Sequence, residues 1–254
     1  MGINIKFTVI TVCFNSENEI CKTIESVLNQ DYGPYEYLVI DGMSTDNTVE
    51  IAKSFQNKFK EKNVLYKIIS EKDTGIYNAM NKGISIASGD FISYLNAGDW
   101  YEKDALKNIN DFYNVGKFEL TYGGLHYIKK DGTITNKMSR LDTFPISSRH
   151  WNHPSMFLKK EIYQKYFFNE SFPTYADFEL YLKLRKDGTK IRVIDKIITN
   201  FVADGVSTDV KFKNVLKRAR EKYKAYRNNG FSLIYMIESY GWEILKSIYF
   251  RIHS

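Results

Sequence analysis

Proline, cysteine and long apolar runs are scarce in this sequence. The 254 residues include only 4 Pro, and no low-complexity tract occurs, which argues against disordered linkers. The two cysteines, Cys13 and Cys21, are too few for a disulfide framework, and no Cys/His spacing typical of a metal site occurs. No run is long enough to span a bilayer, and no apolar signal region follows a basic start. We therefore expect a cytoplasmic protein.

Glycine-rich phosphate loops are also absent. Asn15-Ser-Glu-Asn18 follows the first predicted strand, where a dinucleotide-binding protein would carry its glycines, and no phosphate-loop pattern occurs. A nucleotide bound here would need another partner for its diphosphate.

The bulk composition is that of a large folded domain with a soluble surface. Hydrophobic residues make up 43% and charged residues 26%. Lys and Arg number 36 against 30 Asp and Glu, and much of the excess lies in residues 211–224. This basic run suits phosphates or an anionic membrane, or is simply the solvated face of a helix. We expect no nucleic-acid partner.

Apolar runs alternate with helical patterns through the first hundred residues. Strands are predicted at 5–14, 35–40, 64–69 and from Phe91 onwards. Ser16 and Glu19 have capping-box spacing, and residues 44–48 predict the cap of a second helix. The alternation predicts an α/β fold with a parallel sheet.

The later pattern is mixed. It predicts helices at 103–113 and 175–184 and a basic helix at 210–228. Strands are predicted at 120–128, 191–194 and 197–202, with a hairpin turn at Asp131-Gly132. A further strand is predicted at 151–158, and Pro154 keeps it irregular or at an edge of the sheet. Residues 231–252 are strongly apolar. They either dock on the preceding domain or form a homodimer, or they lie in a membrane interface.

Polar residues stand at the carboxyl ends of the predicted parallel strands. Asn15 follows the first strand, Asp41 the second and Asp99 the fourth, while Asp73 comes shortly after the third. Ligands bind beyond these ends in open α/β sheets, and a carboxylate there suits a sugar hydroxyl or a base imino group. A Mg²⁺ or Mn²⁺ held by Asp99 would replace the missing phosphate loop. The alternative is that residues 96–99 form only a turn.

Several blocks of the sequence resemble family 2 glycosyltransferases in their order and spacing. They are Val9-Ile-Thr-Val-Cys-Phe-Asn15, Val39-Ile-Asp-Gly-Met-Ser-Thr-Asp-Asn-Thr48, Asp73-Thr-Gly-Ile-Tyr-Asn-Ala-Met-Asn-Lys-Gly83, Leu95-Asn-Ala-Gly-Asp-Trp100, His153-Pro-Ser-Met-Phe157, Ala176-Asp-Phe-Glu-Leu180 and Gly205-Val-Ser207. The resemblance implies a GT-A fold, with a Rossmann-like, mostly parallel sheet, and inverting transfer from a nucleotide-diphosphate sugar. It is nearest to bacterial enzymes that build capsule, O-antigen or exopolysaccharide.

The resemblance also implies a domain organisation and a nucleotide pocket. A domain at 1–228 would comprise a nucleotide-binding half (1–101) and an acceptor half (102–228), followed by an amphipathic helical extension at 229–254. The residues implied for the nucleotide are Asp41 and Asp73 at the base and ribose, Asn81 near the ribose and diphosphate, and Thr11, Phe14 and Asn15 in the pocket wall.

The family's Asp-x-Asp motif is incomplete here. Asn96 stands at the first Asp position, on the nucleotide-sugar side, and Gly98 at the second. Asp99 is then the remaining carboxylate for a divalent cation, Mn²⁺ or Mg²⁺.

Asp177 resembles the family's catalytic base. An inverting transfer needs a carboxylate on the acceptor side to take the proton, and no acid is needed to protonate a leaving diphosphate. The alternatives are that Asp177 is a helix N-terminal acid, or that Glu179 is the base. His153, Trp151 and Ser207 are expected on the acceptor or diphosphate side, with core packing as the alternative for the two rings.

The leading hypothesis is thus a glycosyltransferase that uses a nucleotide sugar, a UDP-sugar first of all, and a glycan or lipid-linked acceptor, with peripheral membrane association as an option. A nucleotidyltransferase would need a glycine-rich basic loop after the first strand. A degenerate nucleotide-sugar-binding module is the non-catalytic alternative, suggested by the missing Asp residues at 96 and 98.

Overall fold

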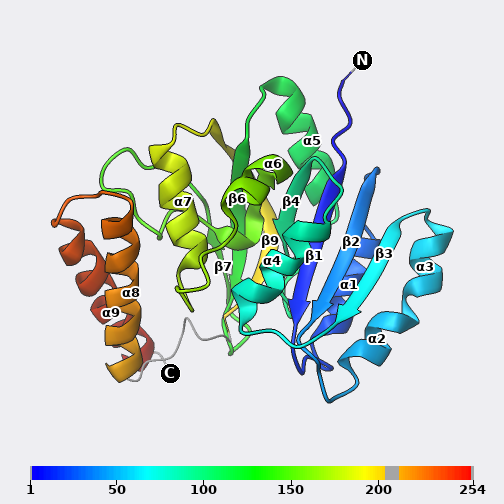
Figure 1. Ribbon diagram of the computed structural model, residues 1–254, viewed down its shortest axis with the longest axis horizontal. Helices are drawn as coiled ribbons and strands as arrows, with labels where there is room; N and C mark the ends of the chain where they lie inside the picture. Colours follow the sequence, from blue (N-terminus) through cyan, green and yellow to red (C-terminus); the bar gives the residue numbers. More distant parts are fainter. Residues whose placement is uncertain (1, 204–211, 253–254) are drawn as a thin grey trace.

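The computed structural model describes residues 2–203 and 212–252, and it shows one continuous sheet with helices on both faces (Figure 1). Nine strands of these residues run in the order β3-β2-β1-β4-β8-β6-β9-β5, with β7 paired to β6. The strands are β1 Phe7–Cys13, β2 Tyr35–Asp41, β3 Leu65–Ser70, β4 Phe91–Tyr94, β5 Trp100–Tyr101, β6 Leu120–Ile128, β7 Ile134–Lys137, β8 Met156–Lys159 and β9 Ile191–Val202. The helices are α1 Ile20–Leu28, α2 Thr48–Ser54, α3 Gln56–Glu61, α4 Ile76–Ile86, α5 Ala105–Val115, the 3₁₀ helix η1 His153–Ser155, α6 Lys160–Tyr166, α7 Ala176–Lys186, α8 Phe212–Asn228 and α9 Tyr235–Ile252.

The first hundred residues form the predicted parallel unit. β1 pairs with β2 on one side and with β4 on the other, and β2 pairs with β3, all in parallel. Cys13 lies opposite Asp41, which in turn lies opposite Ser70. These strands therefore end at one edge of the sheet, and the polar residues that follow them meet there.

The strand predicted at 151–158 is shorter in the structure than expected. Pro154 lies inside η1, and β8 starts only at Met156. In η1 the missing N–H of proline costs no ladder hydrogen bond, so the following strand is not weakened. β8 is consequently a central strand, antiparallel to both β4 and β6.

β9 is one strand and not the two short strands predicted. The exposed pair Asp195 and Lys196 interrupts the apolar pattern, but the backbone continues through it. β9 runs parallel to β6, and the register between them shifts around Gly124. Such a bulge lets extra residues leave the ladder without ending the strand.

The predicted capping box of the first helix is not formed, whereas Asp46 Oδ1, within the predicted cap of the second helix, accepts the Thr48 N–H at 3.0 Å. α1 starts after Glu19 and α2 after Asn47, and neither residue makes a side-chain cap hydrogen bond. Polar residues of the loops after β1 and β2 form hydrogen bonds with each other. For example, Thr48 Oγ1 accepts the Ser16 N–H at 2.7 Å. The loop after β1 is thereby tied to the loop after β2.

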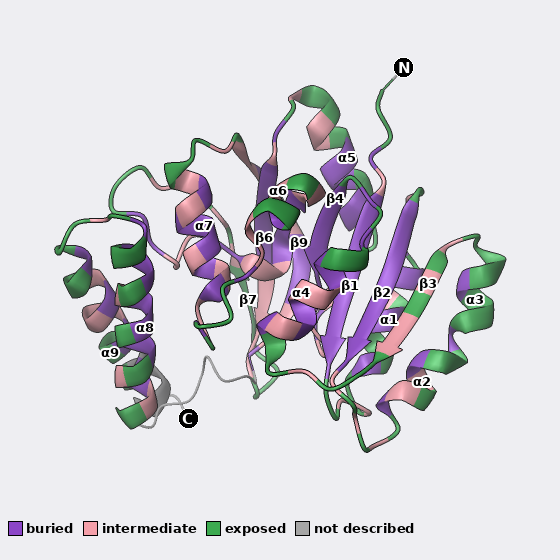
Figure 2. Cartoon of the chain, viewed as in Figure 1, coloured by how far each residue is buried: buried purple, intermediate pink, exposed green. Residues whose placement is uncertain are grey.

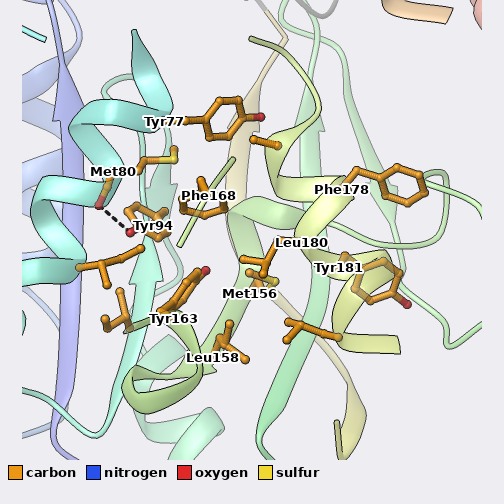
Figure 3. Close-up of a cluster of buried hydrophobic side chains, with 14 of the residues drawn as sticks. Tyr77, Met80, Tyr94, Met156, Leu158, Tyr163, Phe168, Phe178, Leu180 and Tyr181 are labelled. Atoms are coloured by element: carbon orange, nitrogen blue, oxygen red, sulfur yellow. Dashed lines mark hydrogen bonds between the residues drawn. The ribbon is translucent and has the colours of Figure 1, made fainter. Parts of the chain in front are cut away.

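Two hydrophobic clusters cover the two faces of the sheet (Figure 2). One packs α4, α6 and α7 against the sheet, and the other packs α1, α3 and α5. Figure 3 shows part of the first cluster, where Tyr94 of β4 donates a hydrogen bond to the carbonyl of Met80 at 3.0 Å. Burial on both faces explains why the parallel strands are apolar nearly throughout.

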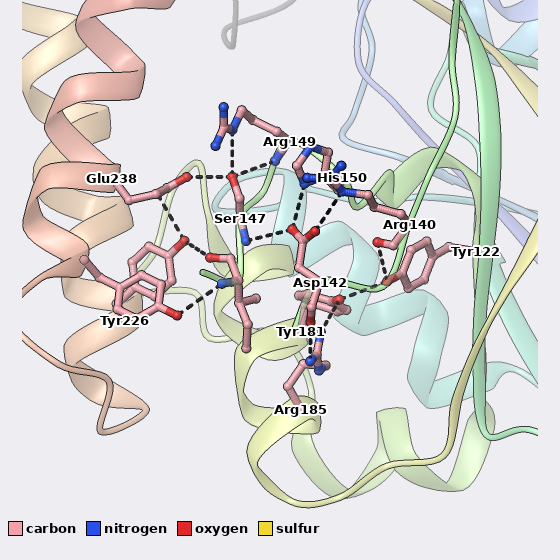
Figure 4. Close-up of polar contacts among 12 residues, drawn as sticks. Tyr122, Arg140, Asp142, Ser147, Arg149, His150, Tyr181, Arg185, Tyr226 and Glu238 are labelled. Atoms are coloured by element: carbon pink, nitrogen blue, oxygen red, sulfur yellow. Dashed lines mark hydrogen bonds and ion pairs between the residues drawn. The ribbon is translucent and has the colours of Figure 1, made fainter. Parts of the chain in front are cut away.

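α8 and α9 pack side by side next to α7, at the end of the molecule opposite α2 and α3 (Figure 1). Two buried ion pairs join them, Arg218 Nε to Glu243 Oε2 at 2.9 Å and Lys222 Nζ to Glu238 Oε2 at 2.8 Å. Glu238 also accepts a hydrogen bond from Ser147 at 2.6 Å (Figure 4). Breaking one partner of a buried pair is costly, so α9 is firmly docked on the preceding domain.

Candidate active site

The loops after β1 and β2 form the first part of the site. Asp41 has a fully buried carboxylate that accepts the Ser44 N–H at 3.0 Å and the hydroxyls of Ser44 and Ser70. Asn15 Oδ1 accepts the Thr45 N–H at 2.9 Å, and its own N–H bonds to Ser44 Oγ. The Asp41 carboxylate thus helps to shape this loop, and its predicted contact with a nucleotide stays a prediction.

The exposed side of the paired loops carries an aromatic ring and a carboxylate. The side chain of Phe14 is 60% exposed and lies beside Gly42. A Cβ atom at Gly42 would come within 2.5 Å of Asp73 Oδ2, so glycine is what lets this carboxylate approach the strand end. Met43 and Asn15 have positive φ values of 64° and 48°, a strained backbone that often marks ligand sites. A ring beside a carboxylate suits a nucleobase and its ribose.

Two predicted nucleotide contacts have side chains that are used elsewhere. Thr11 is fully buried, and its hydroxyl pairs with Tyr37 Oη at 2.9 Å. Asn81 Nδ2 donates to the Phe168 carbonyl and to Glu170, while its Oδ1 accepts the Phe168 N–H. Thr11 lies in the core and Asn81 fixes the loop that precedes α7, and their predicted nucleotide contacts stay predictions.

Asn96, Gly98 and Asp99 follow β4, where a cation is predicted. Asn96 Oδ1 is buried and has no hydrogen-bond partner in the described part of the chain. Gly98 has a φ of 99°, which would strain any residue with a Cβ atom, so the missing second aspartate suits this backbone. Asp99 is 4% exposed and accepts the Val202 N–H at 3.0 Å, and burial raises the pKa of its carboxyl to about 7.

These oxygens fit a cation only as part of a larger set of ligands. Within residues 2–203 and 212–252, no three His, Cys, Asp or Glu side chains gather as metal ligands. Mg²⁺ is commonly held by one or two carboxylates together with substrate phosphates. Asn96 Oδ1 and the Asp99 carboxylate therefore suit a cation that arrives with a diphosphate.

A cavity of about 1080 Å³ lies beside Asn96 and reaches from η1 and α7 to the β6–β7 hairpin and α9. Four of its lining residues have a buried polar atom without a hydrogen-bond partner among the described residues. These atoms are Asn96 Oδ1, Trp151 Nε1, Asn152 Oδ1 and His153 Nε2. Buried polar groups are normally satisfied, so this concentration indicates a polar ligand such as a sugar.

Asp177 lies in the wall of this cavity, in the first turn of α7. Its Oδ1 accepts hydrogen bonds from Tyr77 Oη at 3.0 Å and from the Phe178 N–H at 2.8 Å. Its Oδ2 lies 3.6 Å from His153 Nδ1, and the side chain is 19% exposed. Glu243 also lines the cavity, but it is buried in the ion pair with Arg218. Asp177 is therefore the carboxylate that a ligand can reach.

His153 and Trp151 lie in the same wall. The His153 ring stacks on Tyr94 with centroids 5.8 Å apart, and burial lowers the pKa of His153 although Asp177 opposes that shift. His153 is therefore neutral at pH 7. The Trp151 ring stacks on Tyr181 at 4.9 Å and is 5% exposed, which favours the core alternative for the ring. The predicted Ser207 lies outside the residues that the structure describes.

Tyr77 and Trp242 are missed by the sequence reasoning. Tyr77 lies inside one of the family-like blocks, but nothing local shows that its hydroxyl meets Asp177, a hundred residues later. Trp242 of α9 lines the cavity, with the Arg149 guanidinium 4.5 Å from its ring. No sequence signal connects the C-terminal helix to this cavity.

Glu221 of α8 is a third residue that was missed, and it caps α7 just before Asp177. Its Oε1 accepts the N–H groups of Thr174 at 2.6 Å and Tyr175 at 2.7 Å. We expect Glu221→Ala to lower the free energy of unfolding by about 2 kcal/mol, because two part-buried donors lose their acceptor. Glu221→Gln keeps an acceptor oxygen and should retain most of the stability. Urea unfolding measures both variants, and an unchanged midpoint for Glu221→Ala would contradict the capping role.

The sequence is similar to known proteins over most of its length. The sequence model of the family described as "Glycosyl transferase family 2" matches residues 8–182. A relative from Methanococcus voltae, "Dolichyl N-acetyl-alpha-D-glucosaminyl phosphate 3-beta-D-2,3-diacetamido-2,3-dideoxy-beta-D-glucuronosyltransferase", is 32% identical over 220 residues. The match covers 76% of this chain and 66% of that relative. The chain spans 21% to 36% of the length of three further curated relatives.

Solved structures share the fold. TarS of S. aureus, residues 1-349 in complex with UDP, superposes with a TM-score of 0.66 at 18% identity, covering 94% of this chain and 70% of that one. The mannosyltransferase PcManGT of Pyrobaculum calidifontis, in complex with GDP-Man and Mn²⁺, gives a TM-score of 0.63 at 14% identity, covering 98% and 74%. The predicted GT-A fold is confirmed.

Proposed function

This chain belongs to glycosyl transferase family 2, and we propose that it moves a sugar from a nucleotide-diphosphate sugar to a hydroxyl of a glycan or lipid-linked acceptor, with inversion. The observation that carries the proposal is the cavity in which the Asp177 carboxylate meets four unsatisfied polar atoms of the described chain. UDP in the TarS structure supports a UDP-sugar donor, and the relative named for a dolichyl phosphate-linked sugar supports a lipid-linked acceptor. The proposed product is a bacterial surface polysaccharide.

Asp177 is the proposed general base. The acceptor hydroxyl attacks the anomeric carbon from the face opposite the leaving diphosphate, so a carboxylate on the acceptor side must take its proton. Tyr77 Oη and the Phe178 N–H hold Oδ1, which fixes the carboxylate and leaves Oδ2 for the hydroxyl. Burial lowers the pKa of His153, which disfavours a cationic imidazolium beside this carboxylate.

The donor would lie along the carboxyl edge of the parallel strands. The exposed Phe14 ring is the proposed platform for the base, and Asp73 the partner of the ribose. Asn96 Oδ1 and Asp99 would hold a divalent cation, and Mn²⁺ in the PcManGT structure supports that choice of ion. When bound, the cation supplies positive charge against the diphosphate.

A screen of nucleotide sugars with and without Mn²⁺ tests this function. We expect one UDP-sugar to raise the melting temperature, since a ligand at 100 times its Kd stabilises the fold by about 2.7 kcal/mol. The same donor should then release UDP slowly into water or onto an acceptor. Binding without nucleotide release from any donor would favour the degenerate binding module, which Gly98 motivates. Release of pyrophosphate from a nucleoside triphosphate in the presence of a sugar 1-phosphate would instead indicate a nucleotidyltransferase.

A further inference from the structure

α9 carries an apolar face that the rest of the described chain leaves uncovered. At about 100° per residue, the members of this face fall within one sector of the helix and the turn before it. They are Leu233, Ile234, Ile237, Ile244, Leu245 and Ile248, each 41% to 71% exposed. Single exposed apolar side chains are common, but a contiguous face of this kind marks an interaction site.

α8 carries a stripe of cations next to this face. Its exposed basic residues are spaced three or four positions apart, so they share one side of the helix. They are Lys213, Lys217, Arg220, Lys224 and Arg227. The acidic residue of α8, Glu221, is buried beneath α7. The stripe is thus positive along its whole described length.

A pair of tyrosines shows that the stripe and the apolar face border each other. The rings of Tyr223 on α8 and Tyr240 on α9 are in contact, with centroids 6.5 Å apart. Tyr223 lies one helical turn from Arg227, and Tyr240 lies one turn from both Ile237 and Ile244. The two features therefore share an edge on the same side of the helix pair.

We propose that this combined face of α8 and α9 is the surface by which the protein lies on an anionic phospholipid bilayer. Apolar side chains of interfacial helices enter the boundary between headgroups and acyl chains, and flanking Lys and Arg meet anionic lipids. A second copy of this chain fits less well, because it would leave the cationic stripe without the anionic partner that anionic lipids supply. Among the described helices none has the length and apolar character to cross a bilayer.

The apolar face is continuous with the cavity of the candidate active site. Leu245 belongs to the face and also lines the cavity, together with Trp242 and Asp177. A membrane-anchored acceptor would thus reach Asp177 from the bilayer surface. This consequence rests on the proposed function, whereas docking on the membrane does not.

Vesicle flotation of the full chain tests the docking. We expect binding to vesicles of phosphatidylglycerol and phosphatidylcholine, and much weaker binding to phosphatidylcholine alone or at high salt. Ile237→Glu should reduce the partition coefficient about tenfold, because it places a charge among the inserting side chains. Lys217→Glu should reduce it about fivefold or more on the anionic vesicles, because each basic residue contributes about 1 kcal/mol.

Val115→Glu on α5 is the matched control, since Val115 is an apolar side chain that is 82% exposed on another helix. It should bind vesicles like the parent protein. All three side chains are exposed, so thermal unfolding should be unchanged and loss of binding would not reflect misfolding. Unchanged binding of Ile237→Glu overturns the proposal. So does a dimer in solution that Ile237→Glu dissociates while anionic vesicles stay unbound. Neither outcome depends on sugar transfer.

Discussion

Asp177→Asn is expected to abolish sugar transfer and to leave nucleotide binding intact. The amide has the size of the carboxylate, and its oxygen can still accept the hydrogen bonds of Tyr77 and Phe178. It cannot take a proton from the acceptor hydroxyl at neutral pH. A positioned general base contributes roughly 10² to 10⁴ in rate, so kcat should fall by that order. Initial rates measure the loss, and titration calorimetry with UDP shows whether the nucleotide site is intact.

Glu179→Gln is the matched control for the base. Glu179 lies two residues further on the same helix, where burial raises its pKa and its carboxylate is within 3.5 Å of Asn229 Nδ2. It does not line the cavity among the residues described, so transfer should stay close to that of the parent protein. Full transfer by Asp177→Asn would refute the assignment. Loss of transfer in Glu179→Gln alone would make Glu179 the base.

Asp99→Asn is expected to remove the Mn²⁺ dependence and to weaken binding of the donor about tenfold to a hundredfold. The amide keeps an oxygen for the Val202 N–H, so the turn is retained, while the charge that attracts a cation is lost. Thermal shifts with the donor, measured across Mn²⁺ concentrations, report the effect. Asp104→Asn is a suitable control, because Asp104 is an exposed carboxylate five residues later that makes no side-chain cap hydrogen bond. An unchanged Mn²⁺ dependence of Asp99→Asn would reduce residues 96–99 to a turn.

The pKa of Asp99 adds a pH signature to that experiment. Burial raises this pKa from 3.8 to about 7. At a pH between these two values, the folded protein therefore holds a proton that the unfolded chain has released. The stability that follows from this proton is present below the unfolded pKa and declines as the pH rises through about 7. Cation binding requires the carboxylate and should strengthen over the same range. Asp99→Asn should lack both trends.

The parallel half of the fold could be predicted because its inner strands β1, β2 and β4 are buried on both faces. A strand such as β1 must then be apolar nearly throughout, and that pattern is visible without knowing its neighbours. β8 could not be placed in the same way. Whether a four-residue strand after Pro154 is central or at an edge depends on β4 and β6, which reach it from distant parts of the chain.

By itself the sequence determined the alternation of strands and helices in the first hundred residues, the family, and the position of Asp177 at the start of a helix. Only the tertiary structure decided which carboxylates a ligand can reach. Asp41 is hydrogen-bonded to Ser44 and Ser70, whereas Asp177 keeps an oxygen towards the cavity. The physical reason is that burial and hydrogen bonding depend on partners tens to a hundred residues away, which no local pattern records. For the same reason only the structure shows that α9 lines the cavity.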